Sequence, residues 1–233
     1  MIDIKVIGSS SKGNAYLLDD SKTKLLLECG VGWRQIQQAA EFKTSEIAGC
    51  LVSHEHGDHV KSIKDVLKAG IDCYMSPGTA NALNIEHHRI KGVQAKKPFK
   101  IGTFQIMAFD VQHDVSEPFG FLIMNQAGEK LLFATDTYYI KYKFPGLTHI
   151  MVECNYSASI LDANIALGKV PQVMKKRLTR SHFSLENVKE FFKANDLSKV
   201  EEIHLLHLSD SNSDEALFKE EIMKLTGKPV YIA

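Results

Sequence analysis

The chain has 233 residues, of which 44% are hydrophobic and 24% charged, a composition typical of an ordinary globular protein. Its 28 lysines and arginines balance 28 aspartates and glutamates, so the molecule as a whole has no net charge that would attract nucleic acid or a membrane. No apolar run approaches the ~20 residues of a membrane-spanning helix, which argues against a membrane-embedded protein and a membrane partner.

The N-terminal residues predict a strand, a turn and two more strands. Residues 2–7 alternate apolar and polar side chains, residues 15–18 and 25–27 are apolar, and a Gly/Ser-rich turn occupies residues 8–14. The turn is not a phosphate-binding P-loop, because Asn-Ala follows the second glycine where that motif needs Lys and Ser or Thr. It is either a plain turn or a hairpin near an active site. The first residues lack the layout of a signal peptide, so we expect a cytoplasmic protein.

From residue 33 onward, helical and strand patterns alternate. The predicted helices cover residues 33–42, 60–69, a segment beginning near 77, 158–166, 170–178, 185–194 and about 214–225. The predicted strands cover residues 47–52, 72–75, 104–109, 119–124, 130–134, 149–153, 203–208 and 230–232. Strands followed by helices, twice over, predict a single α/β domain over residues 1–233. Two sheet-plus-helix halves, about 1–100 and 101–233, would pack sheet to sheet.

The four cysteines, Cys29, Cys50, Cys73 and Cys154, are scattered and form no C-x-x-C pair. Three of them lie in apolar runs with the character of strands. We therefore expect reduced thiols in the core, and neither a disulfide framework nor a cysteine-type zinc site.

The residues with the clearest chemistry are 53–59, Ser-His-Glu-His-Gly-Asp-His, which we call the metal motif. It follows an apolar strand, and a helix is predicted just beyond its last histidine. His54 and His56 are two residues apart, so at a strand end their side chains leave the same face and can share one metal ion. Asp58 and His59, beyond Gly57, turn toward a second position nearby.

Three later residues can supply further ligands, since each follows a predicted apolar strand: His113, Asp136 and His207. Taken singly, each would have a structural or solvated role. In this order after the metal motif, they make the chain resemble the metallo-β-lactamase superfamily along its whole length. The resemblance implies an αβ/βα sandwich, which agrees with the strand-and-helix pattern.

The resemblance also implies a ligand set for two divalent metal ions. His54, His56 and His113 would bind one ion, Asp58, His59 and His207 the other, and Asp136 would bridge them. Two ions roughly 3.5–4 Å apart can hold a hydroxide and clamp the attacking and leaving oxygens. Zinc is the expected metal, while manganese and iron also suit these ligands. The bridging aspartate and the last histidine of the motif differ from true β-lactamases and favour the glyoxalase II and nuclease branches.

Two further residues favour a phosphodiester substrate by resemblance. In nuclease-type members, a histidine before the last metal ligand pairs with a glutamate after the bridging aspartate, and His182 and Glu153 match that pair. His182 is then a candidate general acid for the leaving alkoxide, and Asp58 is a third residue with an expected catalytic role. The alternatives are helix-end packing for His182 and a solvated strand end for Glu153.

A basic segment, residues 169–180, leads into this histidine without any acidic residue. It is either a solvated helix face or a surface that binds phosphate oxygens. The candidate substrate contacts are Ser10, Lys12, Asn14, Arg177 and Arg180.

The turn 8–14 and the sequence His207-Leu-Ser with Asn212 resemble the WalJ (YycJ) group of the superfamily, which is associated with DNA and includes exonuclease-like enzymes. The chain departs from that group at Ser181 and Phe183, where glycine and leucine are usual, and at Tyr138, where glycine is expected after the bridging aspartate. The resemblance implies a two-metal phosphodiesterase or nuclease that acts on DNA or RNA ends through a metal-bridging hydroxide. A carboxylic-ester, thioester or lactone hydrolase on the same metal site is the alternative.

Overall fold

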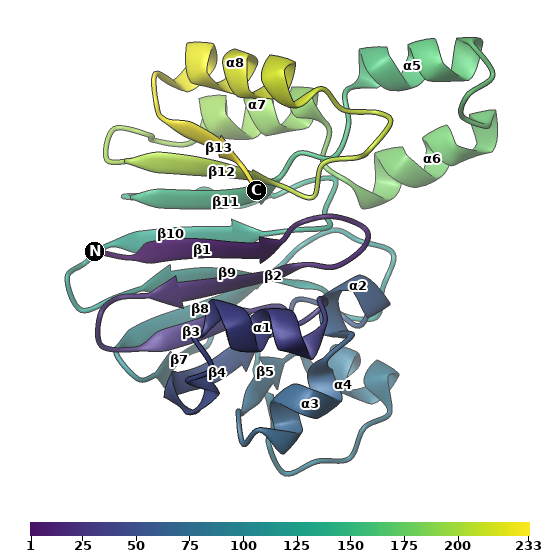
Figure 1. Cartoon of the computed structure of the whole chain (residues 1–233). Coiled ribbons are helices and arrows are strands. Elements are labelled where there is room, and N and C mark those ends of the chain that lie inside the picture. Colours follow the sequence, from purple (N-terminus) through teal and green to yellow (C-terminus); the bar gives the residue numbers. More distant parts are fainter. The chain divides into compact units, whose positions relative to one another are not determined.

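The computed structural model describes residues 1–233 and divides them into two compact units. Unit 1 consists of Met1–Asp110 and Val115–Glu129, and unit 2 consists of Val111–Asp114 and Lys130–Ala233. Both units combine strands with helices, so the fold is of the mixed α/β class, as predicted (Figure 1). None of the helices combines the length and the apolar character needed to cross a membrane.

Unit 1 contains a six-stranded sheet in the order β1-β2-β3-β4-β5-β6. Its strands are β1 Asp3–Gly8, β2 Ala15–Asp19, β3 Lys24–Leu27, β4 Ile47–Leu51, β5 Cys73–Met75 and β6 Ile90–Gly92. The first three strands pair antiparallel, and the pairs from β3 to β6 are parallel. A second, antiparallel group in unit 1 comprises β7 Pro98–Ile101, β8 Phe104–Asp110 and β9 Phe119–Met124.

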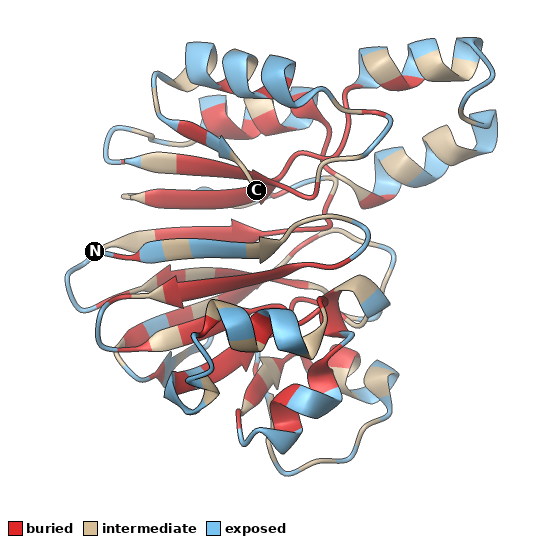
Figure 2. Ribbon diagram, viewed as in Figure 1, coloured by how far each residue is buried: buried red, intermediate tan, exposed pale blue.

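The core of unit 1 lies between its six-stranded sheet and its helices, which are α1 Trp33–Ala39, α2 Gly57–Val60, α3 Ile63–Lys68 and α4 Pro77–Leu83. Leu26 and Cys50 from the strands pack with Ile36 and Val66 from the helices, and all four are fully buried (Figure 2). All four cysteines of the chain are buried free thiols, which confirms the expectation from their spacing.

The prediction of one helix over residues 60–69 is wrong. Helix α2 begins at Gly57, inside the metal motif, and a break separates it from α3. At the break, the Ser62 hydroxyl donates to the Val31 carbonyl, and the Ser62 backbone N–H donates to the Cys29 carbonyl at 2.9 Å. These contacts with a distant segment replace the hydrogen bonds that a continuous helix would make.

Unit 2 contains a parallel sheet in the order β13-β12-β11-β10, formed by β10 Lys130–Ala134, β11 His149–Glu153, β12 Glu202–Leu206 and β13 Val230–Ile232. Its helices are α5 Ala158–Ala166, α6 Gln172–Ser181, α7 Leu185–Ala194 and α8 Glu215–Thr226. Helix α7 buries Leu185, Val188, Phe191 and Phe192, which lie on one helical face. Because the carboxyl ends of parallel strands share an edge, the residues that follow β10, β11 and β12 are positioned close together.

The bounds of β9, β10, β11, α5, α7 and β13 agree with those predicted. The pattern does not predict β6 or β7, because each is short and interrupts its apolar residues with lysine.

Candidate metal centre

In unit 1 the three imidazoles of the metal motif converge. His54 Nε2 lies 3.1 Å from His56 Nδ1, and the ring centroids of His54 and His59 are 4.1 Å apart. His54 and His59 are buried, whereas Asp58 is partly exposed. The Ser53 hydroxyl contacts His54 Nδ1 at 2.9 Å, which fixes the ring and leaves its Nε2 toward His56. Such an outer contact is how proteins orient metal-binding imidazoles.

Glu28 contacts the metal motif, and it was not predicted as a site residue from the sequence. Its side chain is fully buried, accepts a 3.0 Å hydrogen bond from the Ser53 backbone N–H and lies 3.4 Å from His59 Nδ1. Burial raises the pKa of the Glu28 carboxyl, although the contacts with His59 and Ser53 oppose the rise. Its φ of 60° is in the left-handed region. An acid placed directly after three apolar residues was the only signal for it in the sequence.

The turn 8–14 contacts the metal motif through Asn14. The Asn14 backbone N–H donates to the Asp58 carbonyl at 2.8 Å, and its side-chain amide lies 3.2 Å from both Asp58 Oδ2 and His59 Nε2. Asn14 is fully buried, and its side chain also donates to the Ser10 carbonyl at 3.1 Å within the turn. Ser10 and Lys12 instead line a pocket of about 240 Å³. The structure agrees with the second interpretation of this turn, a hairpin next to the candidate site.

Replacing Gly30 with alanine is expected to destabilise the protein by about 1–3 kcal/mol, the usual cost of overpacking, and to lower its metal content. A Cβ at Gly30 would lie 1.6 Å from the backbone oxygen of Asp58, so the motif would have to shift. Urea unfolding and metal analysis measure both effects. Gly92→Ala is the matched control, because a Cβ there meets nothing within 4 Å. Equal stability of the two variants would contradict this account of the motif.

In unit 2, Asp136 and His207 lie just beyond the ends of β10 and β12. His207 Nδ1 is 3.0 Å from Asp136 Oδ1, and both residues are buried. Their φ angles, 46° and 53°, are in the left-handed region, which costs free energy for residues other than glycine. Strain of this kind persists where the surrounding structure holds a residue for a functional reason.

His113 is oriented by the end of helix α6. Its Nδ1 lies 3.0 Å from the Ser181 carbonyl oxygen, and its Nε2 lies 3.8 Å from Asp136 Oδ2. Burial lowers the pKa of His113, although the charges of Asp136 and Glu153 oppose the change, so the ring favours the neutral form that can bind a metal. Ser181 was not predicted as a site residue, since its backbone carbonyl carries the contact.

The structure brings together Glu153 and His182, the two residues that the resemblance pairs. His182 Nδ1 lies 2.6 Å from Glu153 Oε1, and the other carboxylate oxygen accepts hydrogen bonds from the backbone N–H groups of Thr137, at 2.9 Å, and Phe183, at 3.1 Å. Burial opposes charge on His182, yet the Glu153 carboxylate prevails and raises the pKa of His182. Burial likewise opposes charge on Glu153, and His182 lowers the pKa of Glu153 below its ordinary value. The pair is therefore an oriented imidazole held by a buried carboxylate.

The donors of unit 2 fit a divalent metal ion. Asp136 lies 3.8 Å from His113 Nε2 and 3.0 Å from His207 Nδ1, so one carboxylate and two imidazoles of the expected ligand set meet in unit 2. Imidazole nitrogen and carboxylate oxygen are ligands that zinc takes, and the second nitrogen of a binding histidine is usually held by a carbonyl or a carboxylate, as that of His113 is. The chemistry of the set therefore matches the expectation of metal binding.

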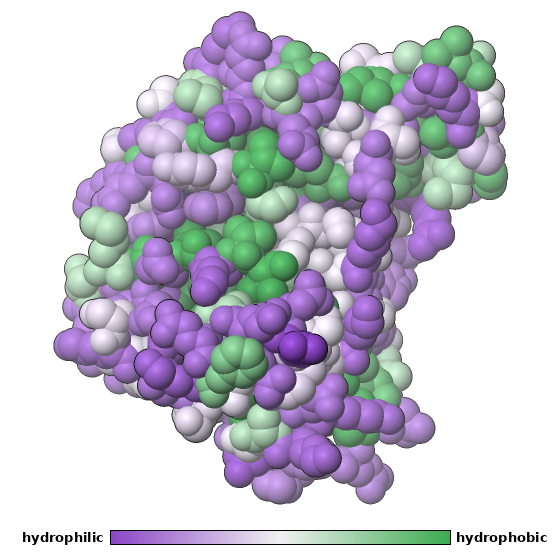
Figure 3. All heavy atoms as spheres, viewed as in Figure 1, coloured by the Kyte–Doolittle hydropathy of each residue, from purple (hydrophilic) through white to green (hydrophobic).

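The basic segment forms helix α6, whose last turn leads into the Glu153–His182 pair. Arg177 and Arg180 are exposed, and Lys175 forms an ion pair with Asp162 of α5. Figure 3 shows the surface of α5 and α6, at the upper right, as a mixture of hydrophilic and hydrophobic side chains. Leu167 and Val173, in this part of the chain, are exposed apolar residues. The arginines are thus accessible to a ligand, and their role in binding one remains a prediction.

Comparisons with known proteins agree with this geometry. The family model described as "Beta-lactamase superfamily domain" matches residues 23–207. The chain is 24% identical to Exodeoxyribonuclease YycJ of Bacillus anthracis, over 96% of this chain and 89% of that protein. It is 26% identical to Exodeoxyribonuclease WalJ of Streptococcus pneumoniae, over 91% of this chain and 83% of that protein. Its fold is similar to that of the metallo-beta-lactamase fold protein YhfI of Bacillus subtilis, with a TM-score of 0.76, 18% identity, and coverage of 100% and 95%. The predicted fold class is thereby confirmed.

Proposed function

The chain belongs to the beta-lactamase superfamily, as a hydrolase of that family, and we propose that it is a two-metal phosphodiesterase that acts on the ends of DNA or RNA. The observation that carries the proposal is the 2.6 Å contact between Glu153 and His182, beside the metal-ligand residues of unit 2. An imidazole held by a buried carboxylate is suited to give a proton to a leaving alkoxide. The exodeoxyribonuclease names of the two relatives support the same substrate class.

The proposed ligand set is the one expected from the sequence. His54, His56 and His113 would hold one divalent ion, Asp58, His59 and His207 the second, and Asp136 both. When bound, such ions supply a nucleophile at neutral pH and stabilise the charge that develops on the phosphoryl group. Zinc is the proposed metal, with manganese or iron as alternatives, because nitrogen and carboxylate ligands accept all three. Asp58 would act as a ligand in this scheme.

His182 and Glu153 each have a distinct task in the proposed reaction. Because His182 Nδ1 contacts Glu153, its Nε2 is the atom that would donate a proton to the leaving oxygen of the substrate. Glu153 would keep this ring oriented and favour its protonated form, in line with the raised pKa of His182. The backbone N–H groups of Thr137 and Phe183 hold the carboxylate in place for that task.

Metal removal and a substrate panel test the proposal. We expect about two divalent ions per chain in protein purified without added metal, and loss of activity after treatment with EDTA that zinc or manganese restores. The panel consists of bis(p-nitrophenyl) phosphate, 5′-labelled DNA, an RNA oligonucleotide, a thioester and a lactone. Turnover of the phosphodiesters is expected. Turnover of the carbonyl substrates alone would overturn the proposal in favour of an ester, thioester or lactone hydrolase.

A further inference from the structure

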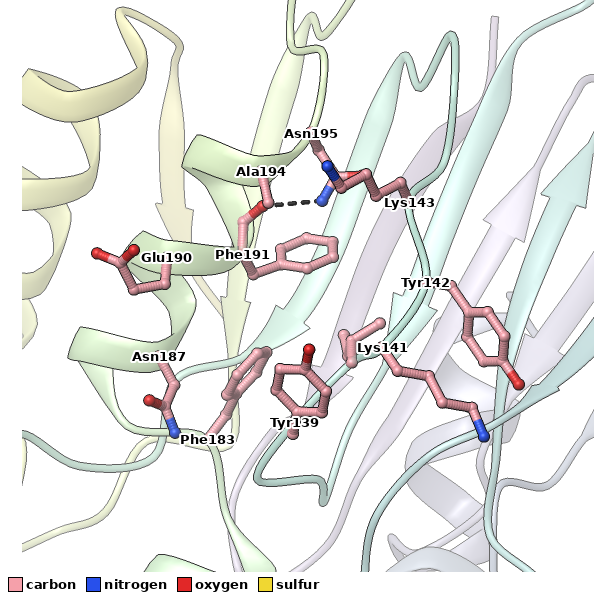
Figure 4. A pocket seen from close by; sticks show the side chains of 11 residues that line it. Tyr139, Lys141, Tyr142, Lys143, Phe183, Asn187, Glu190, Phe191, Ala194 and Asn195 are labelled. Carbon is pink, nitrogen blue, oxygen red and sulfur yellow. Dashed lines mark hydrogen bonds between the residues drawn. The ribbon is translucent and has the colours of Figure 1, made fainter.

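A pocket of about 290 Å³ lies in unit 2 between the loop that follows Asp136 and helix α7 (Figure 4). Its wall includes Phe183, which follows His182 directly, and Tyr139, which follows shortly after Asp136. Phe191 of helix α7 lies near Phe183, with the ring centroids 6.3 Å apart. The volume is at the lower end of the ~300–1,000 Å³ of small-molecule pockets, so it suits one compact ring system.

The pocket is held open by hydrogen bonds between its two walls, loop 138–144 and helix α7. The Asn187 side-chain amide donates to the Tyr138 carbonyl at 3.1 Å, and the Asn195 side-chain oxygen accepts from the Phe144 backbone N–H at 2.9 Å. Thr137 closes the start of the loop, because its hydroxyl donates to the Tyr139 carbonyl at 3.0 Å. Anchored at both ends, the loop presents a preformed cavity.

The pocket shares its anchor with the proposed general acid. Glu153 accepts hydrogen bonds from Thr137, at the start of the loop, and from Phe183, in the wall of the pocket, while its other oxygen contacts His182. The backbone of the pocket wall at Thr137 and Phe183 is therefore bonded to the same carboxylate that holds the proposed general acid.

The lining combines aromatic rings with positive charge. Tyr139, with 55% of its surface exposed, offers an accessible ring, and the Lys141 ammonium lies 5.2 Å from the ring centroid of Tyr142. Lys143 adds a second exposed cation. Glu190 also lines the pocket, but Lys193 contacts its carboxylate at 2.7 Å and offsets its charge.

We propose that this pocket binds the base of the nucleotide next to the scissile phosphodiester, with Tyr139 as the principal stacking residue; the inference rests on the proposed function. Aromatic faces stack on any base, and nearby lysines attract the phosphates that accompany it. The acyl chain of a thioester would use the rings but carries no negative charge to interact with the positive lining. The charge of the lining therefore favours a nucleotide.

The binding experiment uses the full chain in chelator, so that no substrate is cleaved. Single-stranded oligonucleotides carry 2-aminopurine at one terminal nucleotide or the other, and stacking on an aromatic ring quenches its emission. We expect quenching with wild-type protein and binding that is weaker by roughly 5- to 150-fold for Tyr139→Ala, the loss that corresponds to one base–aromatic stack. Tyr139→Phe should bind as the wild type does. Tyr231→Ala is the matched control, since Tyr231 is 47% exposed on β13 and does not line the pocket.

The kinetic experiment uses metal-loaded protein and compares an oligonucleotide with the same molecule made abasic at its terminal position. Wild-type protein should prefer the intact end through KM, and Tyr139→Ala should lose that preference. The inference would be overturned if the wild type had the same KM for the intact and the abasic oligonucleotide, or if wild type and Tyr139→Ala bound equally well. Either result would leave phosphodiester hydrolysis intact. Hydrolysis of no phosphodiester at all would instead overturn the proposed function. If Tyr139→Ala lost activity only toward an octanoyl thioester, the pocket would bind an acyl chain instead of a base.

Discussion

Asp136→Ala protein will have lost hydrolytic activity and a large part of its metal. The Asp136 carboxylate is buried, lies 3.0 Å from His207 Nδ1 and 3.8 Å from His113 Nε2, and is proposed to bind both ions. Loss of an outer partner of a metal ligand typically costs 10–100-fold in affinity or activity, so loss of a shared ligand should cost more than roughly 100-fold. Metal analysis after gel filtration and turnover of bis(p-nitrophenyl) phosphate measure the two effects.

Asp136→Asn separates the loss of the ligand from strain in the backbone. Asp136 has a φ of 46°, and alanine in the left-handed region costs about 1–2 kcal/mol, whereas asparagine is enriched there. Asparagine therefore keeps the local backbone and removes only the negative charge. We expect Asp136→Asn to unfold near the wild-type urea concentration and still to lack activity. Full metal content and activity in this variant would remove Asp136 from the proposed site.

His182→Ala protein should keep its metal and lose most of its activity toward natural phosphodiesters. A lost general acid typically costs 10²–10⁴-fold in rate. The ring contacts Glu153 and is not among the proposed metal ligands, so its removal should leave the metal in place. Metal analysis and the rate on a dinucleotide measure the outcome. His88→Ala, an exposed histidine in unit 1, is the matched control and should behave as the wild type does.

The leaving group distinguishes proton donation from a structural role of His182. Thymidine 5′-(p-nitrophenyl phosphate) releases a stable phenolate that needs no proton, whereas a dinucleotide releases an alkoxide that does. His182→Ala should therefore slow the dinucleotide far more than the p-nitrophenyl ester. An equal loss on both substrates would identify a positioning role, and an unchanged rate on the dinucleotide would remove His182 from the mechanism.

The features that could be predicted from the sequence are those formed by residues close together in the chain. The metal motif, the strands 119–124, 130–134 and 149–153, and the helix 185–194 each depend on a local pattern of apolar and polar residues. Such patterns reflect the period of a strand or a helix and need no knowledge of distant segments. The family and its fold class followed from the order of the histidines and aspartates along the chain.

The partners that orient those residues were decided by the tertiary structure. Ser181 is 68 positions from the His113 that it holds, and Asn14 is 44 positions from Asp58. Glu28 and the break before α3 depend equally on contacts with distant segments. The periodic pattern of a sequence does not reveal such contacts, because the identity of a residue does not show what its backbone carbonyl or buried carboxylate binds.

The sequence by itself was enough to recognise the family and the hydrolase class, and it predicts the ligand types, because metal binding depends on residue identity and order. Only the tertiary structure decided how the imidazole rings are oriented, since Ser53, Ser181 and Glu153 each contact one ring nitrogen of a histidine. It also decided that the loop after Asp136 and helix α7 enclose a pocket. That pocket exists because Asn187 and Asn195 each bond to a loop residue about 50 positions away, and chain folding alone brings them together.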